Sequence, residues 1–197
     1  SYMPAFLVGL GLARSLAAVN EIPLWQISHQ ENHLEAGLWS AQGPDADRFL
    51  LLHASGGTTD LLLAEKQTDS TYALTQAGGS KDLHAGQFVD RVGVALGLQF
   101  PAGAALEQLA ATAADCIELP VAVRQGDVSL SGPATAALRK IEAGADPAAL
   151  AAGVQYAMAE TFVRMIRNVA AQKEIFDVLL VGGVVSNAYI LSLIHIS

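Results

Sequence analysis

The chain has 197 residues, of which 52% are hydrophobic and 15% charged, with a formal net charge of −8. This composition supplies a packed core, and it argues against disorder and against a chain that binds nucleic acid through basic clusters of its own. The single cysteine, Cys116, excludes an internal disulfide and fits a reducing compartment. The absence of an apolar run of eighteen residues predicts no membrane span.

The N-terminal segment reads as two helices separated by a strand. Apolar groups at helical spacing over residues 5–20, with small residues among them, predict a helix that packs in the core. We expect a short strand over residues 23–28, because Pro23 begins an apolar run there. Residues 31–40 are predicted to form the second helix.

The rest of the chain alternates strands and helices, which predicts an α/β protein with a sheet covered by helices. Two apolar runs around the turn Ser-Gly-Gly-Thr-Thr indicate a β-hairpin. The strands are expected at residues 48–55, 60–65, 71–76 and 176–181, with a loop at 77–82, a β-rich segment at 121–132, and helices at 83–98, 105–115, 134–143 and 147–172.

The first candidate site is the pair His29 and His33. Four residues separate them, so both imidazoles can lie on one face of a helix, as a metal site needs. The zinc-protease pattern would place a general base directly after the first histidine, where this chain has Gln30, and Glu31 points about 200° away around the helix. The inverted pattern also fails, because Asn32 precedes the second histidine. A peptidase is therefore disfavoured, and two ordinary polar histidines on a helix are the alternative.

The second candidate is the turn from His53 to Thr59. Its glycines allow backbone N–H groups to approach a phosphate closely, and the hydroxyls of Ser55, Thr58 and Thr59 can add hydrogen bonds. No Gly-Lys-Ser/Thr follows, so this is not a Walker loop. A plain hairpin turn explains the pattern equally well.

Two further segments are typical of ligand contacts in α/β folds. Asp82 is placed to cap the helix that carries Asp90, and the turn ending at Gly103 begins the next helix, where N–H groups can meet a ligand. Near the C-terminal end, an apolar strand enters a Gly-Gly turn, and Asn187 follows at the start of a helix. An amphipathic helix with a solvated face, and a simple helix cap at Asn187, are the structural alternatives.

The order of these motifs is more specific than any one of them. The chain contains His-x-x-x-His, Ser-Gly-Gly-x-Thr, Asp-x-x-Ala-Gly-x-x-x-Asp, a Pro-x-Gly turn, Ser-Gly-x-x-Thr and Gly-Gly-Val-x-x-Asn, in this order. In this order they resemble the TsaD-type family of tRNA threonylcarbamoyladenosine synthases, once described as O-sialoglycoprotein endopeptidases (the glycoprotease family). The resemblance implies an α/β actin-like ATPase fold, the two-lobed fold of sugar kinases and heat-shock ATPases, incomplete at both ends. It places one such domain at residues 1–190 and leaves residues 191–197 as a non-native tail.

The resemblance also implies roles for particular residues. His29 and His33 would bind a divalent metal ion together with an aspartate that lies beyond this chain, and Fe or Zn is expected before Mg. An adenine nucleotide, the threonylcarbamoyl-adenylate, is the expected ligand. Its implied contacts are His53, Ala54, Ser55, Gly56, Gly57, Asp90, Gly103, Glu107 and Asn187.

The chain departs from the family pattern at several motif positions. The family usually has His where this chain has Thr58, and Glu where it has Gln87. Of the two glycines in the family's Pro-Gly-Gly-Pro turn, the chain keeps only Gly103, with Ala102 before it. The lysine of the Ser-Gly-Leu-Lys-Thr motif is replaced by Ala134. These departures are typical of a divergent member.

The implied activity is a cytoplasmic, metal-dependent acyl transfer to a tRNA adenosine next to the anticodon. No covalent nucleophile is identified for it. TsaB-like and TsaE-like proteins would be partners in a multi-protein complex that binds the tRNA, and a dimer is a further expectation. The alternatives are an inactive nucleotide-binding scaffold or dimer partner, a metallopeptidase that lacks a placed base, and another ATPase or kinase of the same fold. The lost lysine, Gln87 and Thr58 favour the scaffold, whereas the intact histidine pair and Asn187 oppose it.

Overall fold

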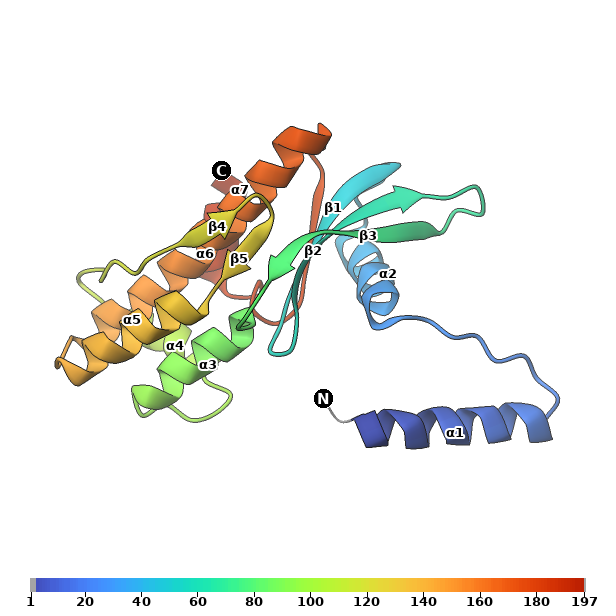
Figure 1. Cartoon of the computed structure of the whole chain (residues 1–197), viewed down its shortest axis with the longest axis horizontal. Helices are drawn as coiled ribbons and strands as arrows, with labels where there is room; N and C mark the ends of the chain where they lie inside the picture. Colours follow the sequence, from blue (N-terminus) through green and yellow to red (C-terminus); the bar gives the residue numbers. More distant parts are fainter. Residues whose placement is uncertain (1–2, 197) are drawn as a thin grey trace.

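The computed structural model describes the backbone of residues 3–196 and the side chains of residues 6–194 (Figure 1). Helices and strands alternate through most of this range, as the sequence predicts. In chain order the elements are α1 (Met3–Val19), α2 (His29–Ala41), β1 (Arg48–Ala54), β2 (Thr59–Lys66), β3 (Tyr72–Ser80), α3 (Ala85–Ala95), α4 (Gly103–Ala110), β4 (Ala122–Arg124), β5 (Asp127–Ser129), α5 (Ser131–Glu142), α6 (Pro147–Lys173), β6 (Val178–Val181) and α7 (Ala188–Ile196).

The strands form one six-stranded sheet in the order β4-β5-β3-β2-β1-β6. β1, β2 and β3 are antiparallel neighbours, and the predicted hairpin pairs Ala54 of β1 with Thr59 of β2. β6 joins β1 in parallel, and β5 joins β3 in parallel. A parallel neighbour needs a long crossover, and the segment from α3 to α6 supplies the crossover that brings β6 back beside β1.

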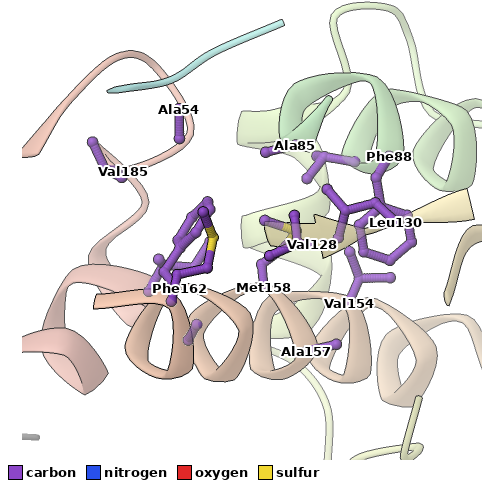
Figure 2. Close-up of a cluster of buried hydrophobic side chains, with 14 of the residues drawn as sticks. Ala54, Ala85, Phe88, Val128, Leu130, Val154, Ala157, Met158, Phe162 and Val185 are labelled. Carbon is purple, nitrogen blue, oxygen red and sulfur yellow. The ribbon is translucent and has the colours of Figure 1, made fainter. Parts of the chain in front are cut away.

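The larger core lies between the sheet and the long helix α6. Leu50, Leu52 and Ala54 alternate along β1 and face this core, where Met158 and Phe162 of α6 are fully buried. Figure 2 shows Val154, Met158 and Phe162 pointing from α6 into the cluster, with Phe88 of α3 above Val154. Burying a side chain of this size contributes about 1.5–3 kcal/mol, so α6 is a main source of stability.

The helix α2 covers the opposite face of β1. Phe49 and Leu51, which lie between the residues of the larger core, pack with Leu34 of α2 and Leu179 of β6. β1 is therefore buried on both faces, which explains its nearly continuous apolar sequence. The side chain at every second position of β1 faces α2, and this alternation also determines where His53 points.

The prediction that the first helix packs in the core is wrong. α1 forms as expected, but Figure 1 shows it standing away from the sheet. Phe6 and Val8 are each 72% exposed, and among the described residues of α1 only Ala17 is buried. Helical spacing predicts the helix itself, whereas its burial depends on a packing partner that the described residues do not provide.

Two local predictions also need correction. Residues 23–28 form no strand and pair with none of the six strands of the sheet. Residues 77–80 are not a loop but the end of β3, where Gly78 and Gly79 continue the pairing with β2. The remaining predicted elements are confirmed, and most of their ends are shifted by a few residues. α4 is the largest shift, since it begins at Gly103 and ends at Ala110.

Asp82 does not cap α3, because His84 occupies the N-cap position. Instead, its carboxylate accepts hydrogen bonds from the Leu130 N–H at 2.9 Å, from the Ser129 hydroxyl at 2.6 Å and from the Ser131 hydroxyl. Burial alone would raise the pKa of Asp82, but these hydrogen bonds to the carboxylate outweigh it and hold the pKa well below its usual range. Asp82 therefore joins the connection before α3 to the start of α5.

No helix within the described range is both long enough and apolar enough to cross a membrane. α7 runs through residue 190 without interruption, so the proposed boundary before residue 191 stays a prediction. Ser197, the last residue of the predicted tail, lies outside the described residues.

Candidate nucleotide and metal sites

The start of α2 positions the histidine pair. Ser28 is the N-cap: its hydroxyl accepts the Glu31 N–H at 3.1 Å, and the Glu31 carboxylate accepts the Ser28 N–H at 2.6 Å. This reciprocal capping box begins the helix at His29. His33 then follows one turn later on the same face, and the ring centroids of the two histidines are 4.6 Å apart. Because Glu31 is engaged in the cap, it does not face the histidines as a general base.

His53 adds a third imidazole to the pair. It lies next to the end of β1, in phase with Phe49 and Leu51, so its side chain faces α2. Its ring centroid is 4.1 Å from that of His33 and 5.4 Å from that of His29. One nitrogen from each of the three rings lies within 4.8 Å of the others. We call His29, His33 and His53 the histidine cluster.

The electrostatics of the histidine cluster favour a neutral ring at His53 and at His33. Burial, and then the neighbouring His33 and His29, lower the pKa of His53 from 6.5 to about 4. The same two causes, burial first and then His29, lower the pKa of His33. His53 is fully buried, and neither of its ring nitrogens has a hydrogen-bond partner within the described part of the chain. Neutral imidazoles with unpartnered nitrogens are the donor set that a transition-metal ion takes, so the residues present fit such an ion.

The sequence predicts His29 and His33 as metal ligands but not His53. The family resemblance instead places His53 among the nucleotide contacts of the turn from His53 to Thr59, which we call the glycine turn. The alternation along β1 was a usable signal, since His53 shares the phase of Phe49 and Leu51. This alternation predicts a contact between His53 and α2 only if α2 is known to cover this face of β1, and only the tertiary structure shows that it does.

A cavity of about 410 Å³ opens beside the glycine turn, where the loops after β1 and β6 meet α3, α4 and α6. Its lining includes Gly56, Asp90, Gly103 and Asn187, four of the predicted nucleotide contacts from four separate parts of the chain. Most of the remaining wall is apolar. A concave, mainly apolar site with a few polar groups suits a ligand of nucleoside size. We call it the glycine-lined cavity.

Close backbone approach forms one side of this cavity. The Gly86 N–H donates to the Ser55 carbonyl at 3.0 Å, and the buried Thr59 hydroxyl accepts the Ala85 N–H at 2.8 Å. A Cβ atom on Gly86 would lie only 2.6 Å from the Gly56 Cα. The glycine turn is thus held against the first turn of α3, and the glycines are required because the two backbones almost touch.

Asp90 and Asn187 have structural contacts as well as positions in the cavity wall. Asp90 accepts the Ala102 N–H at 2.7 Å and so holds the turn that begins α4. The Asn187 side chain accepts the Ile190 N–H at 3.0 Å and caps α7. Asn187 is therefore a helix cap, as the structural alternative predicts, and it also lines the cavity.

The other predicted contacts lie around the glycine-lined cavity and not in its wall. The Ala54 carbonyl accepts the Val184 N–H at 3.1 Å and links the loops after β1 and β6. Ser55 and Gly57 form the turn itself, where the Ser55 hydroxyl accepts the Gly57 N–H at 3.4 Å. Glu107 lines a neighbouring hollow and accepts the Ala188 N–H at 2.8 Å.

The structure shows the surroundings of three of the family departures. Ala134 is fully buried in the larger core, where the charged end of a lysine would lose its hydration. Ala102 is also fully buried, and its N–H bonds to Asp90. The Gln87 side chain accepts the His84 N–H at 3.1 Å, which a glutamate could do equally well. Nothing in the structure explains Thr58.

Residues 2–196 match the family model of TsaD, described as tRNA N6-adenosine threonylcarbamoyltransferase. The chain belongs to the TsaD family. A relative of this name from Methanopyrus kandleri is 34% identical over 194 residues, which are 98% of this chain and 54% of the relative. Another, from Thermus thermophilus, is 37% identical over 186 residues, which are 93% of this chain and 55% of the relative. The chain thus spans about half the length of these curated relatives.

Solved structures confirm the fold expected for a TsaD-family chain. Full-length HypF in a phosphate- and nucleotide-bound form gives a TM-score of 0.71 at 12% identity, covering 88% of this chain and 38% of that chain. HypF from T. kodakarensis also gives 0.71, at 17% identity, over 94% of this chain and 34% of that chain. An activator of 2-hydroxyisocaproyl-CoA dehydratase from Clostridium difficile, with bound ADPNP, gives 0.54 at 14% identity, over 86% and 56%. The fold is therefore the α/β fold of the actin-like ATPase type.

Proposed function

We propose that this TsaD-family chain contributes the nucleotide and metal sites for threonylcarbamoyl transfer from an adenylate to a tRNA adenosine next to the anticodon. The observation that carries the proposal is that the histidine cluster and the glycine-lined cavity both lie at the end of β1. His53 completes the histidine cluster, and Gly56, three residues later, lines the cavity that also contains Asp90 and Asn187. Membership of the TsaD family supports the same reaction class.

The histidine cluster would hold one divalent metal ion. Three imidazole nitrogens favour Zn or Fe over Mg, which prefers oxygen ligands. When bound, such an ion supplies Lewis-acid polarisation of the acyl group or a clamp on the phosphate. The low pKa of His53 serves this role, because a protonated ring has no lone pair to offer.

The glycine-lined cavity would hold the adenylate still. In the transfer, the N6 amino nitrogen of the tRNA adenosine forms a bond to the carbamoyl carbon. The bond from that carbon to the phosphate oxygen breaks, AMP leaves with the bonding electron pair, and the amino nitrogen loses a proton. The contribution of Gly56, Gly103, Asp90 and Asn187 is to orient the adenylate, which removes the entropy cost of finding the reactive geometry.

Partners would supply most of the attraction to tRNA. The formal net charge of −8 opposes a phosphate backbone, so Lys and Arg must come from elsewhere. We propose that TsaB-like and TsaE-like proteins assemble with this chain in the cytoplasm. The alternative, a nucleotide-binding scaffold without activity, is an outcome of the same experiment.

The test measures threonylcarbamoyladenosine formed in tRNA by mass spectrometry, with the partner proteins and the adenylate supplied. We expect wild type and the control Asn32→Ala to modify tRNA, and His33→Ala to lose the modification. Asn32 lies on the same helix but is exposed, outside the histidine cluster. A wild-type chain that binds adenine nucleotide yet modifies no tRNA would replace this proposal with the scaffold.

A further inference from the structure

The side chain of Gln155 in α6 has no role in the sites described so far. It is only 5% exposed, and its carboxamide oxygen has no hydrogen-bond partner within the described part of the chain. A buried acceptor left without a donor costs free energy, so such groups usually have a ligand or a structural partner. Gln155 separates the glycine-lined cavity from the neighbouring hollow that contains Glu107, and it lines both. A ligand in the glycine-lined cavity could therefore supply the missing donor.

The position of Gln155 within that wall separates it from the glycine turns. Gly56, Gly86 and Gly183 line the cavity from the loops after β1 and β6 and the start of α3, where backbone N–H groups suit phosphate. Gln155 comes from α6, beside Val154 and in the same wall as the apolar Leu106 of α4. Figure 2 shows Val154 pointing from α6 toward Phe88 of α3, so this part of α6 borders the apolar interior. A flat, largely apolar base fits the helix wall better than a phosphate does.

We propose that Gln155 is a specificity-determining residue, whose carboxamide oxygen accepts a hydrogen bond from the exocyclic amino group of an adenine base in the glycine-lined cavity. This inference rests on the nucleotide site proposed above. Adenine carries an amino donor at position 6 beside ring acceptors, and a carboxamide offers the complementary acceptor and donor. Asp90 and Asn187 are the other polar side chains in the cavity wall, and each already accepts a backbone hydrogen bond.

The experiment compares two probes on two proteins by calorimetric titration. The probes are AMP and purine riboside 5′-monophosphate, which lacks only the amino group. The proteins are wild type and Gln155→Met, which keeps the volume and removes the acceptor. We expect wild type to bind AMP roughly fivefold to tenfold more tightly than the purine analogue, as for one hydrogen bond to a buried acceptor. Gln155→Met should bind both equally, and this coupling isolates the contact from any general weakening.

Two further variants make the result unambiguous. Gln172→Met applies the same substitution to an exposed position of the same helix and should keep the wild-type preference. Gln155→Leu also removes the acceptor and should also lose the preference, which covers the case in which Gln155→Met does not fold. An equal preference in wild type and Gln155→Met overturns the role of Gln155 and leaves the nucleotide site standing. A wild-type protein that binds neither probe overturns the nucleotide site and this inference together.

Discussion

The histidine cluster and the glycine-lined cavity lie at the same end of β1, yet they are built in opposite ways. The cluster depends on side-chain chemistry, with three imidazoles from α2 and β1 whose nitrogens lie within 4.8 Å of one another. The cavity depends on backbone approach, with glycines that allow loops and a helix to come close together. We therefore expect removal of a side chain to impair the histidine cluster, and addition of a side chain to impair the glycine-lined cavity.

The largest expected effect is the loss of metal from His53→Ala. We expect metal affinity to fall by more than about 100-fold, because removing a direct ligand exceeds the loss caused by outer-shell partners. Binding of AMP should change little, since His53 is outside the cavity wall. Elemental analysis and competition titration with Zn measure the first quantity, and calorimetry measures the second. His84→Ala, a histidine outside the cluster, is the control. Unchanged metal content in His53→Ala would refute the three-histidine site.

The reverse pattern is expected from Gly86→Ala. The new methyl group would meet the backbone of Gly56 and Ser55, which cannot move without displacing the glycine turn. We expect a loss of about 1–3 kcal/mol in the free energy of unfolding, with weaker AMP binding and unchanged metal content. Urea titration and calorimetry give these values. Gly132→Ala is the matched control, because its methyl group would enter open space. Equal stability of the two variants would show that the contact is not tight.

A smaller effect is expected from pH in metal-free protein. Burial and the neighbouring histidines lower the pKa of His53 from 6.5 to about 4 in the folded chain. The unfolded chain therefore binds a proton at higher pH than the folded chain, so the stabilising contribution is complete above about pH 6.5 and is lost as the pH falls toward 4. Chelator-treated protein should have a lower urea midpoint at pH 5 than at pH 7, and His53→Phe should reduce the difference. A midpoint that is insensitive to pH in wild type would contradict a neutral, buried His53.

The smallest effect is expected from a substitution at the start of α3, at a position outside both sites. Gln87→Glu restores the residue that the family usually has, keeps the acceptor for the His84 N–H and adds a negative charge in the first turn of α3. We expect a gain of about 0.3–1 kcal/mol in the free energy of unfolding from the helix dipole. Metal content and AMP affinity should stay within error of wild type. A large change in either affinity would mean that Gln87 belongs to one of the sites.

Sequence patterns correctly predicted those helices and strands that depend mainly on interactions between residues close together in the chain. The hairpin around the glycine turn, the capped and partly buried α6 and the apolar β6 each follow from periodicity, turn residues and caps within a short window. The same reasoning was wrong for residues 23–28, because a strand is stabilised by pairing with a neighbouring strand and these residues pair with none. It was also wrong about burial of α1, because exposure depends on what lies opposite the helix.

The sequence by itself determined the family, the histidine pair on one helical face and four residues of the cavity wall, because ordered motifs and short-range spacing carry that information. Only the tertiary structure decided that His53 joins the pair, that Asp82 bonds to the start of α5, and that Gln155 lies in the cavity wall. The reason is physical. Each of these facts depends on which face of one element packs against another far along the chain, and no local spacing specifies that contact.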